Sequence, residues 1–330
     1  MPSSASSTAA ALSVADVLKQ AAQPVLNAST HEQEEAWPER TIISGQLLSR
    51  EVQAGLYVNM HDVLYLGDCA FDARKERSLS CGLLLAGEVA PIGIRGYDPV
   101  IQTRGRPFLF GLGQATQCDR LWRAGTRSRG AGVTLNPDFL ERFGADVAED
   151  GLALLHQYLQ PGSRSTVLPS SRALTQIAAR LLDHPYRGPL ASLFLESSAL
   201  QFVLEIAFLL RDEDRLVRQL GRWHLGRVTE AREMLDARLA DPPSSLELAR
   251  QVGVNLTTLQ ENFKTAYGLT LFAYVRVERL KLARELILDQ GLGIAEAGYR
   301  VGFGSPAAFT AAYRRQFGHP PSAERGATLN

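Results

Sequence analysis

The chain repeats one pattern near its C-terminus: Leu246–Gly268 reads LELARQVGVNLTTLQENFKTAYG, and Ile294–Gly318 reads IAEAGYRVGFGSPAAFTAAYRRQFG. Each copy predicts a short helix with small residues on its inner side, a turn at Val-Gly, and a longer amphipathic helix that ends in an aromatic residue and glycine. This arrangement is typical of a helix-turn-helix. The sequence therefore predicts two such units, about fifty residues apart.

Individual residues give the pattern a physical basis. Ala249 is small enough for the second helix to pack closely, Gly253 permits the turn conformation, and Asn255 is placed to cap the next helix. The matching residues of the second copy are Ala297, Gly302, Phe303 and Ser305. One such match also fits an ordinary helical hairpin, but a tandem pair joined by a continuous helix over about Leu271–Asp289 is much harder to explain that way.

About 100 residues around these copies resemble the DNA-binding domain of AraC/XylS-type transcription regulators. The resemblance rests on R-x-E-R-x-K-x-A from Arg276, on I-A-x-x-G-x-x-V-G-F from Ile294, and on the closing F-G-x-P-P-S from Phe317. It implies seven helices, two recognition helices that enter successive major-groove faces of double-stranded DNA, and RNA polymerase as a partner. Gly298 departs from the usual pattern of the family.

The first recognition helix is expected to read most of the DNA sequence. After the Asn255 cap, helical spacing turns Leu256, Thr257, Gln260 and Glu261 outward and Leu259 and Phe263 inward. Glutamine can bond adenine, threonine can meet a thymine methyl, and glutamate can accept from cytosine.

The second recognition helix has few groups that can read bases. Phe309 and Tyr313 are expected in the core, which leaves Thr310 as the polar reader, so this unit should depend more on DNA shape and backbone contacts. The predicted DNA-binding residues of both units are Thr257, Gln260, Glu261, Lys264, Thr310, Arg314 and Arg315.

The first part of the chain predicts a different kind of fold. Residues about 40–145 contain short β-rich runs punctuated by Gly, Asp and Pro, at a spacing typical of a sandwich or barrel. The expected strands cover Thr41–Ile43, Leu56–Val58, Val63–Leu66, Cys81–Leu85, Pro107–Phe110 and Gly132–Leu135. Residues 1–36, rich in Ser, Ala, Gln and Glu, are expected to be mobile, with one short helix conceivable over Val14–Ala21.

Helical periodicity replaces the strands after residue 137. Short helices are expected over Pro137–Phe143 and Ser170–Leu182, and a long one over Leu190–Arg211. The apolar stripe of the long helix can equally be a core face or a dimer seam, and its interrupting Glu196, Gln201 and Glu205 argue against a membrane span. We expect the polar segment RDEDRLVR, at 211–218, to be the domain boundary or a linker. The apolar stripe comprises Leu193, Leu200, Val203, Ala207 and Leu210.

Three segments of the first half resemble the sensor domain of the pyochelin-type, siderophore-responsive subgroup of the same family. The clearest is HPYRGPL at His184–Leu190, just before the long helix. This resemblance implies a cupin-like β-barrel that binds a small-molecule effector, such as a ferric siderophore. The expected effector-binding residues are Arg95, Tyr97, Arg104, Trp122 and Arg127. Arg106, Arg123 and Arg129 are further candidates, and the alternative for each arginine of the whole set is a solvated strand end.

Composition excludes several alternatives. The 35 Lys and Arg balance 35 Asp and Glu, which argues against a polybasic protein, although residues 220–330 hold a small basic excess of 14 against 11. Three cysteines and six scattered histidines supply no disulfide framework, zinc site or other metal site, and no catalytic or nucleotide-binding motif is present. We therefore expect no cofactor and no enzymatic activity.

Together these observations predict an α+β protein: a mobile stretch at 1–36, a β-rich ligand-sensing and dimerisation domain with a helical hairpin at 37–219, and an all-α DNA-binding domain at 220–330. The expected function is that of a cytoplasmic transcription activator that responds to a small molecule. No export signal or membrane contact is expected. The alternative is a ligand-independent regulator whose first half serves only to form a homodimer.

Overall fold

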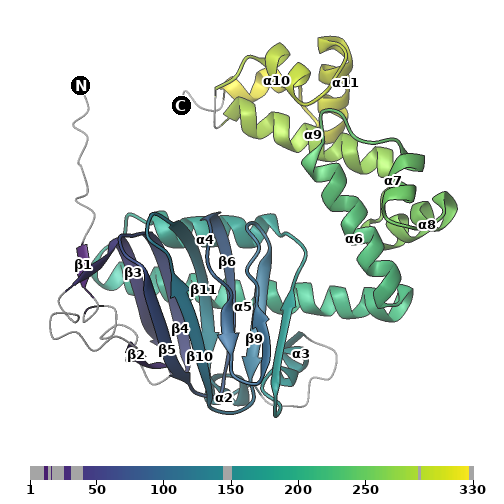
Figure 1. The fold of residues 1–330 in the computed structure, drawn as a ribbon. Coiled ribbons are helices and arrows are strands. Elements are labelled where there is room, and N and C mark those ends of the chain that lie inside the picture. The colour runs from purple at the N-terminus through teal and green to yellow at the C-terminus, as the bar shows by residue number, and fades with distance from the viewer. Residues whose placement is uncertain are drawn as a thin grey trace, which may run out of the picture. The chain divides into compact units, whose positions relative to one another are not determined.

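A computed structural model describes residues 11–13, 16, 26–30, 40–143, 151–288 and 291–326. The contacts between residues divide the chain into two compact units, Met1–Glu213 and Asp214–Asn330. Strands form most of the first unit and helices form the second (Figure 1). The fold is therefore α+β, as predicted.

Two antiparallel sheets form the body of the N-terminal unit. The larger sheet has the strand order β1-β3-β4-β11-β6-β9-β12, and the smaller has the order β2-β5-β10-β7-β8. The strands are β1 (Ala11–Ser13), β2 (Leu26–Thr30), β3 (Thr41–Gln53), β4 (Leu56–Tyr65), β5 (Cys69–Lys75), β6 (Ser78–Gly87), β7 (Ile92–Ile94), β8 (Tyr97–Val100), β9 (Pro107–Leu112), β10 (Thr116–Trp122), β11 (Arg127–Leu135) and β12 (Ser163–Val167).

Helices pack against the larger sheet. They are α2 (Pro137–Glu141), α3 (Gly151–Gln157), α4 (Arg172–Asp183) and α5 (Gly188–Leu220). Leu174 and Leu181 of α4 and Phe202 and Ile206 of α5 share one buried core with Leu79 on the sheet face toward them. The opposite face of each strand is then directed toward the smaller sheet, because side chains alternate along a strand.

Helices α4 and α5 make the predicted helical pair. Ser171 Oγ donates to Glu205 Oε1 at 2.9 Å, and Arg180 Nη2 donates to Gln201 Oε1 at 3.4 Å. Helix α5 is long and apolar enough to cross a membrane, but 44% of its most apolar window is buried inside the fold. A core helix of this length meets the same criterion.

The structure corrects several sequence expectations for this unit. Leu56–Val58 and Val63–Leu66 belong to a single strand, β4, and residues 11–13 and 26–30 lie in strands rather than in a mobile tail. Strands β5, β7, β8, β10 and β12 were not predicted. The expected helix over Val14–Ala21 lies outside the described residues, apart from Asp16.

The segment expected to be a linker is helical. Helix α5 continues past Arg211 to Leu220, so all of 211–218 belongs to it. Arg218 pairs with Asp214 at 2.9 Å and Arg215 donates to Gln219 at 3.2 Å, both one helical turn apart. Polar residues at this spacing stabilise an exposed helix. The two compact units divide between Glu213 and Asp214, inside this segment, so the boundary lies where it was expected. The chain crosses it as a continuous helix and not as an irregular linker.

The C-terminal unit contains the two predicted helix-turn-helix pairs. Its helices are α6 (Arg222–Ala237), α7 (Ser245–Gln251), α8 (Leu256–Tyr267), α9 (Leu271–Leu288), α10 (Ile294–Arg300), α11 (Pro306–Phe317) and the 3-10 helix η2 (Pro321–Gly326). Helices α7 and α8 form the first pair, α10 and α11 form the second, and α9 runs between them in the chain, as predicted. Each pair has its own buried core.

The caps and turns agree with the sequence analysis. Asn255 Oδ1 accepts from the Thr258 amide at 2.8 Å, and Ser305 Oγ accepts from the Ala308 amide at 3.2 Å. Gly253 and Gly302 both have positive φ, +71° and +90°. Only glycine adopts this conformation without strain, which explains the residue at both turns.

Candidate functional site

The outer face of α8 carries the residues predicted to read DNA. Thr257, Gln260, Glu261 and Lys264 are all exposed, whereas Leu259 and Phe263 are buried in the core of the first pair. Leu256 was expected to face outward, but it is half-buried and packs on the same core. In the first turn of α8, Thr257 is therefore available to contact DNA, and Leu256 is not.

The outer face of α11 is a shallow depression with few polar groups. Pro306, Ala307, Thr310, Ala311, Arg314 and Arg315 line it. Phe309 and Tyr313 are fully buried, as predicted, and Thr310 is only half-exposed. Arginines at the end of a face made mostly of methyl groups suit contacts with phosphates more than hydrogen bonds to bases.

Gly298, the departure from the family pattern, has a packing reason. A Cβ at this position would lie 3.0 Å from the Phe309 ring. Phe309 itself is fully buried, in a core that includes Ala297 and Tyr313. The missing side chain lets the large ring of the recognition helix approach α10.

Arg279 of α9 connects the two helix-turn-helix pairs, and the sequence analysis assigned it no role. Its guanidinium donates to the Leu239 carbonyl at 2.6 Å, to the Ala240 carbonyl at 3.0 Å and to the Gly302 carbonyl at 3.0 Å. Leu239 and Ala240 precede the first pair, and Gly302 forms the turn of the second. One side chain therefore holds both pairs at a set separation. The motif R-x-E-R marked this residue, but only the folded chain shows its partners.

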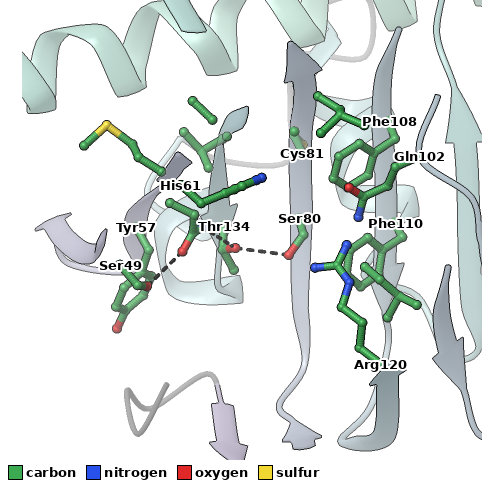
Figure 2. Close-up of a pocket in the computed structure, with 18 of the residues that line it drawn as sticks. Ser49, Tyr57, His61, Ser80, Cys81, Gln102, Phe108, Phe110, Arg120 and Thr134 are labelled. Carbon is green, nitrogen blue, oxygen red and sulfur yellow. Dashed lines mark hydrogen bonds between the residues drawn. The ribbon is translucent and has the colours of Figure 1, made fainter. Parts of the chain in front are cut away.

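The N-terminal unit encloses a cavity of about 340 Å³ between its two sheets (Figure 2). This volume lies at the lower end of the range of roughly 300–1,000 Å³ typical of small-molecule sites. Its walls are mainly apolar and include Phe71, Phe108, Phe110 and Ile92. Strands β3, β4, β6, β9 and β11 of the larger sheet and β5, β7 and β10 of the smaller sheet contribute to it.

A chain of hydrogen bonds crosses the larger sheet inside this cavity. Lys75 Nζ donates to Ser80 Oγ at 2.5 Å, and the hydroxyls of Ser80 and Thr134 lie 3.0 Å apart (Figure 2). Asn59 Nδ2 donates to Thr134 at 3.0 Å and accepts from Ser49 Oγ at 2.8 Å. All five side chains line the cavity, which therefore has a polar floor within apolar walls.

Cationic groups gather at one end of this floor. Lys75 is 8% exposed, its Nζ lies 4.4 Å from the centre of the Phe110 ring, and burial lowers its pKa to about 8, with a further contribution from the charge of Arg120. Burial also lowers the pKa of His61 to about 4, again assisted by Arg120. Neither Lys75 nor Arg120 forms an ion pair within the described part of the chain.

Most of the predicted effector-binding residues lie elsewhere. Of the five, Trp122 lines the cavity, but Arg95, Tyr97, Arg104 and Arg127 are exposed and do not. Arg127 pairs with Asp62 at 3.2 Å, and Arg95 and Tyr97 border a separate surface depression. Of the further candidates, Arg123 is exposed, Arg129 pairs with Asp183, and Arg106 donates to the Leu168 carbonyl. Clustering of arginines along the chain therefore did not locate the cavity.

Lys75, Arg120 and His61 line the cavity and were not among the predicted effector-binding residues. A signal for the first two was present. The run Cys69-x-Phe71-x-Ala73-x-Lys75 buries every second residue. On the neighbouring strand, Cys118 is buried and Arg120 and Trp122 are half-buried, whereas Asp119 and Leu121 between them are exposed. Because side chains alternate between the two faces of a strand, this spacing indicates that Lys75 and Arg120 face the same side as their apolar neighbours.

Helix α5 also has an exposed apolar stripe. Leu190, Leu193, Leu204 and Phe208 expose between 52% and 66% of their surface. Val203, Ala207 and Leu210 are buried against the sheet, and Leu200 packs on the edge of the same core. The residues predicted to form one stripe therefore lie on two faces of α5. Leu200, Val203, Ala207 and Leu210 belong to the core face, and Leu193 belongs to the exposed face.

Comparison with known proteins identifies both units. Residues 44–220 match the family described as regulatory protein PchR N-terminal domain, and residues 248–327 match the family described as helix-turn-helix domain. The regulatory protein PchR of Pseudomonas aeruginosa is 30% identical over 155 residues, which cover 45% of this chain and 52% of that protein.

Other relatives match a smaller part of the chain. ExsA of Pseudomonas aeruginosa, an HTH-type transcriptional regulator, is 32% identical over 113 residues, covering 33% of this chain and 38% of ExsA. The virulence regulon transcriptional activator VirF of Yersinia enterocolitica is 38% identical over 79 residues, covering 24% and 29%. The chain thus spans about half or less of the length of these relatives.

Among solved structures, an AraC-type regulator from Chromobacterium violaceum covers 32% of this chain and 95% of its own, with 30% identity and a TM-score of 0.31. The matched families and relatives are transcription regulators and not enzymes. With more than half of its length matched by the PchR N-terminal domain and a helix-turn-helix domain following it, the chain belongs to the AraC family of DNA-binding transcription regulators.

Proposed function

We propose that this protein is a cytoplasmic transcription activator that senses a small molecule in the cavity between its two sheets. The observation that carries the sensing role is the cavity itself, because a domain that served only for dimerisation would need no polar floor inside an apolar core. The chain is similar to VirF, which is named as a transcriptional activator, and to the regulatory protein PchR. This similarity supports activation of transcription. Productive contact with RNA polymerase belongs to the same proposal.

On DNA, the proposed readers are Thr257, Gln260 and Glu261 on α8 and Thr310 on α11. Lys264, Arg314 and Arg315 are proposed to contact phosphates. One chain would then cover two tandem major-groove segments about one helical turn apart. The support for this assignment is the position of these side chains on the second helix of each pair, where all are exposed except the half-exposed Thr310.

A homodimer through α5 is part of the proposal. Four large apolar residues on one stripe, Leu190, Leu193, Leu204 and Phe208, each expose more than half of their surface. Contiguous apolar surface of this kind marks interaction sites. A self-complementary helix face suits a two-fold dimer.

The experiment that tests the sensing role uses the full-length chain, its operator and a panel of ferric siderophores with their iron-free forms. A true effector present at a hundredfold excess over its dissociation constant stabilises the protein by about 2.7 kcal/mol. It should also change transcription from the operator in a purified system with RNA polymerase. If DNA affinity and transcription ignore every compound that binds, the ligand-independent alternative is correct.

A further inference from the structure

The cavity contains buried hydrogen-bond donors without acceptors. Arg120 Nη2 and Trp122 Nε1 are both buried and have no hydrogen-bond partner within the described part of the chain. Guanidinium and indole N–H groups can only donate. Buried donors are normally satisfied, so these two point to a partner that supplies acceptor atoms.

The charge in the cavity leads to the same conclusion. Lys75 and Arg120 occupy inward positions on the adjacent strands β5 and β10, and each pKa is lowered by burial. Among the residues that line the cavity, Asp119 is the carboxylate, but it is exposed at an outward position of β10. A cationic pair without a counter-ion destabilises the empty protein, and an anion in the cavity would remove that cost.

The remaining walls define the rest of the ligand. Phe71, Phe108, Phe110 and Ile92 border the cationic end, and Phe110 lies directly under the Lys75 ammonium. In Figure 2 the Arg120 guanidinium lies among these lining side chains, beside Phe110. Apolar walls of this type bind rings and hydrocarbon, and they give no reason to hold a fully hydrated ion.

We propose that the cavity binds an organic anion with an aromatic or otherwise apolar body, whose carboxylate or phenolate is held by Lys75 and Arg120. The Trp122 indole and the Ser80 and Thr134 hydroxyls supply further polar contacts along the floor. This inference rests on the sensing role proposed above and names the chemical class of the effector. A neutral ligand of the same shape would leave both cations unpaired and would bind less well.

Calorimetric titration of the full-length protein with 2-naphthoate and 2-naphthamide tests the inference. The two probes have the same ring system and differ in charge. We expect 2-naphthoate to bind at least about tenfold more tightly, as loss of a buried charge-assisted hydrogen bond predicts. Equal affinities for the two probes overturn the inference, and so does a failure of 2-naphthoate, benzoate and cinnamate all to bind.

Three variants locate the binding. Lys75→Met and Arg120→Met should each weaken 2-naphthoate about tenfold or more and change the naphthamide affinity little. Arg74→Met is the matched control, because Arg74 neighbours Lys75 but is exposed on the outer side of β5. An equal loss of 2-naphthoate affinity in Arg74→Met would mean that only overall charge matters, which contradicts the inference.

The melting temperature of the ligand-free protein distinguishes a loss of binding from a loss of folding. Lys75→Met removes a buried charge, so its melting temperature should equal or exceed that of the original protein while its affinity for 2-naphthoate falls. The failure of the two proposals can be told apart. Anion binding in the cavity without any effect on transcription removes the sensing role alone, and a neutral effector that controls transcription removes the anion inference alone.

Discussion

Lys75 holds an ammonium group where water has little access. Its nearest charged or titratable neighbours are Arg120 and Cys118 on β10 and Cys81 on β6. Burial raises the pKa of both thiols, so they stay neutral through the physiological range. The folded protein therefore bears the full cost of this charge whenever Lys75 is protonated.

This cost predicts a rise in stability with pH. The pKa of Lys75 is about 8 in the folded chain and 10.5 in an unfolded one, so between these values the unfolded state binds more protons and folding becomes more favourable as pH increases. Urea unfolding at pH 7, 9 and 10 should show the free energy of unfolding of the original protein rising relative to that of Lys75→Met. Parallel pH curves for the two proteins would show that Lys75 is not the cause.

Gln260 and Arg315 are both exposed, but they lie on different recognition helices. Gln260→Ala should cost on the order of 1–3 kcal/mol and relax the preference at one base pair, because the side-chain amide of glutamine can accept from adenine through its oxygen and donate to it through its nitrogen. Arg315→Ala should weaken all sequences about equally and reduce the salt dependence by roughly one unit of slope.

Gel-shift titrations on an operator and its single-base variants, at two salt concentrations, separate these effects. Gln201→Ala in the N-terminal unit is the control, since it removes an exposed glutamine far along the chain from both recognition helices. If Gln260→Ala weakens every operator variant equally and Arg315→Ala changes the base preference, the two roles are reversed.

At the scale of secondary-structure elements, the two helix-turn-helix pairs share a turn but not its surroundings. A Cβ at Gly253 would meet no atom within 4 Å. At Gly302 it would lie 2.3 Å from the Ala240 carbonyl oxygen and 2.9 Å from the Arg279 guanidinium. The second turn is therefore also part of the junction between the pairs.

This difference predicts unequal effects of the same substitution. Gly253→Ala should cost about 1–2 kcal/mol, since alanine is strained at positive φ. Gly302→Ala should cost at least about 1 kcal/mol more, because the methyl group must also displace backbone. Chemical unfolding monitored in the C-terminal unit measures both. Equal losses of unfolding free energy in the two variants would show that the contacts around Arg279 rearrange at little cost.

At the scale of the whole molecule, α5 is the element that gives the protein its proposed oligomeric state. Leu204 is 66% exposed on the apolar stripe, whereas Leu200 packs on the core. Leu204→Asp should therefore convert a dimer to a monomer in sedimentation experiments without lowering the melting temperature, and Leu200→Asp should lower the melting temperature because it places a charge against the core.

Gln176→Asp is the control for this experiment. Gln176 is exposed on α4 and is not part of the apolar stripe of α5. The variant should remain dimeric, which separates loss of the stripe from a general effect of negative charge. A Leu204→Asp protein with the same sedimentation behaviour as the original would remove α5 from the dimer proposal.

Much of the C-terminal unit follows from the sequence alone. Helical contacts are local, so residues three and four positions apart reveal the faces of α8 and α11, and Asn255, Ser305, Gly253 and Gly302 mark where the helices begin and turn. The apolar residues Leu259, Phe263, Phe309 and Tyr313 are buried as their spacing predicts. The segment 211–218 does contain the division between the two units, but the helix end expected at Arg211 was wrong, because charged residues fit a solvated helix as well as they fit a linker.

The cavity was decided by tertiary structure. Period two indicates which residues of a strand share a face, but not which strands lie beside it or what the face encloses. Arg120 and Lys75 face the same cavity because β10 pairs with β5, and the polar floor exists because β4, β11 and β6 lie side by side. The β4–β11 pairing joins residues as far apart as Leu56 and Leu135, and only the folded chain brings Asn59 to Thr134.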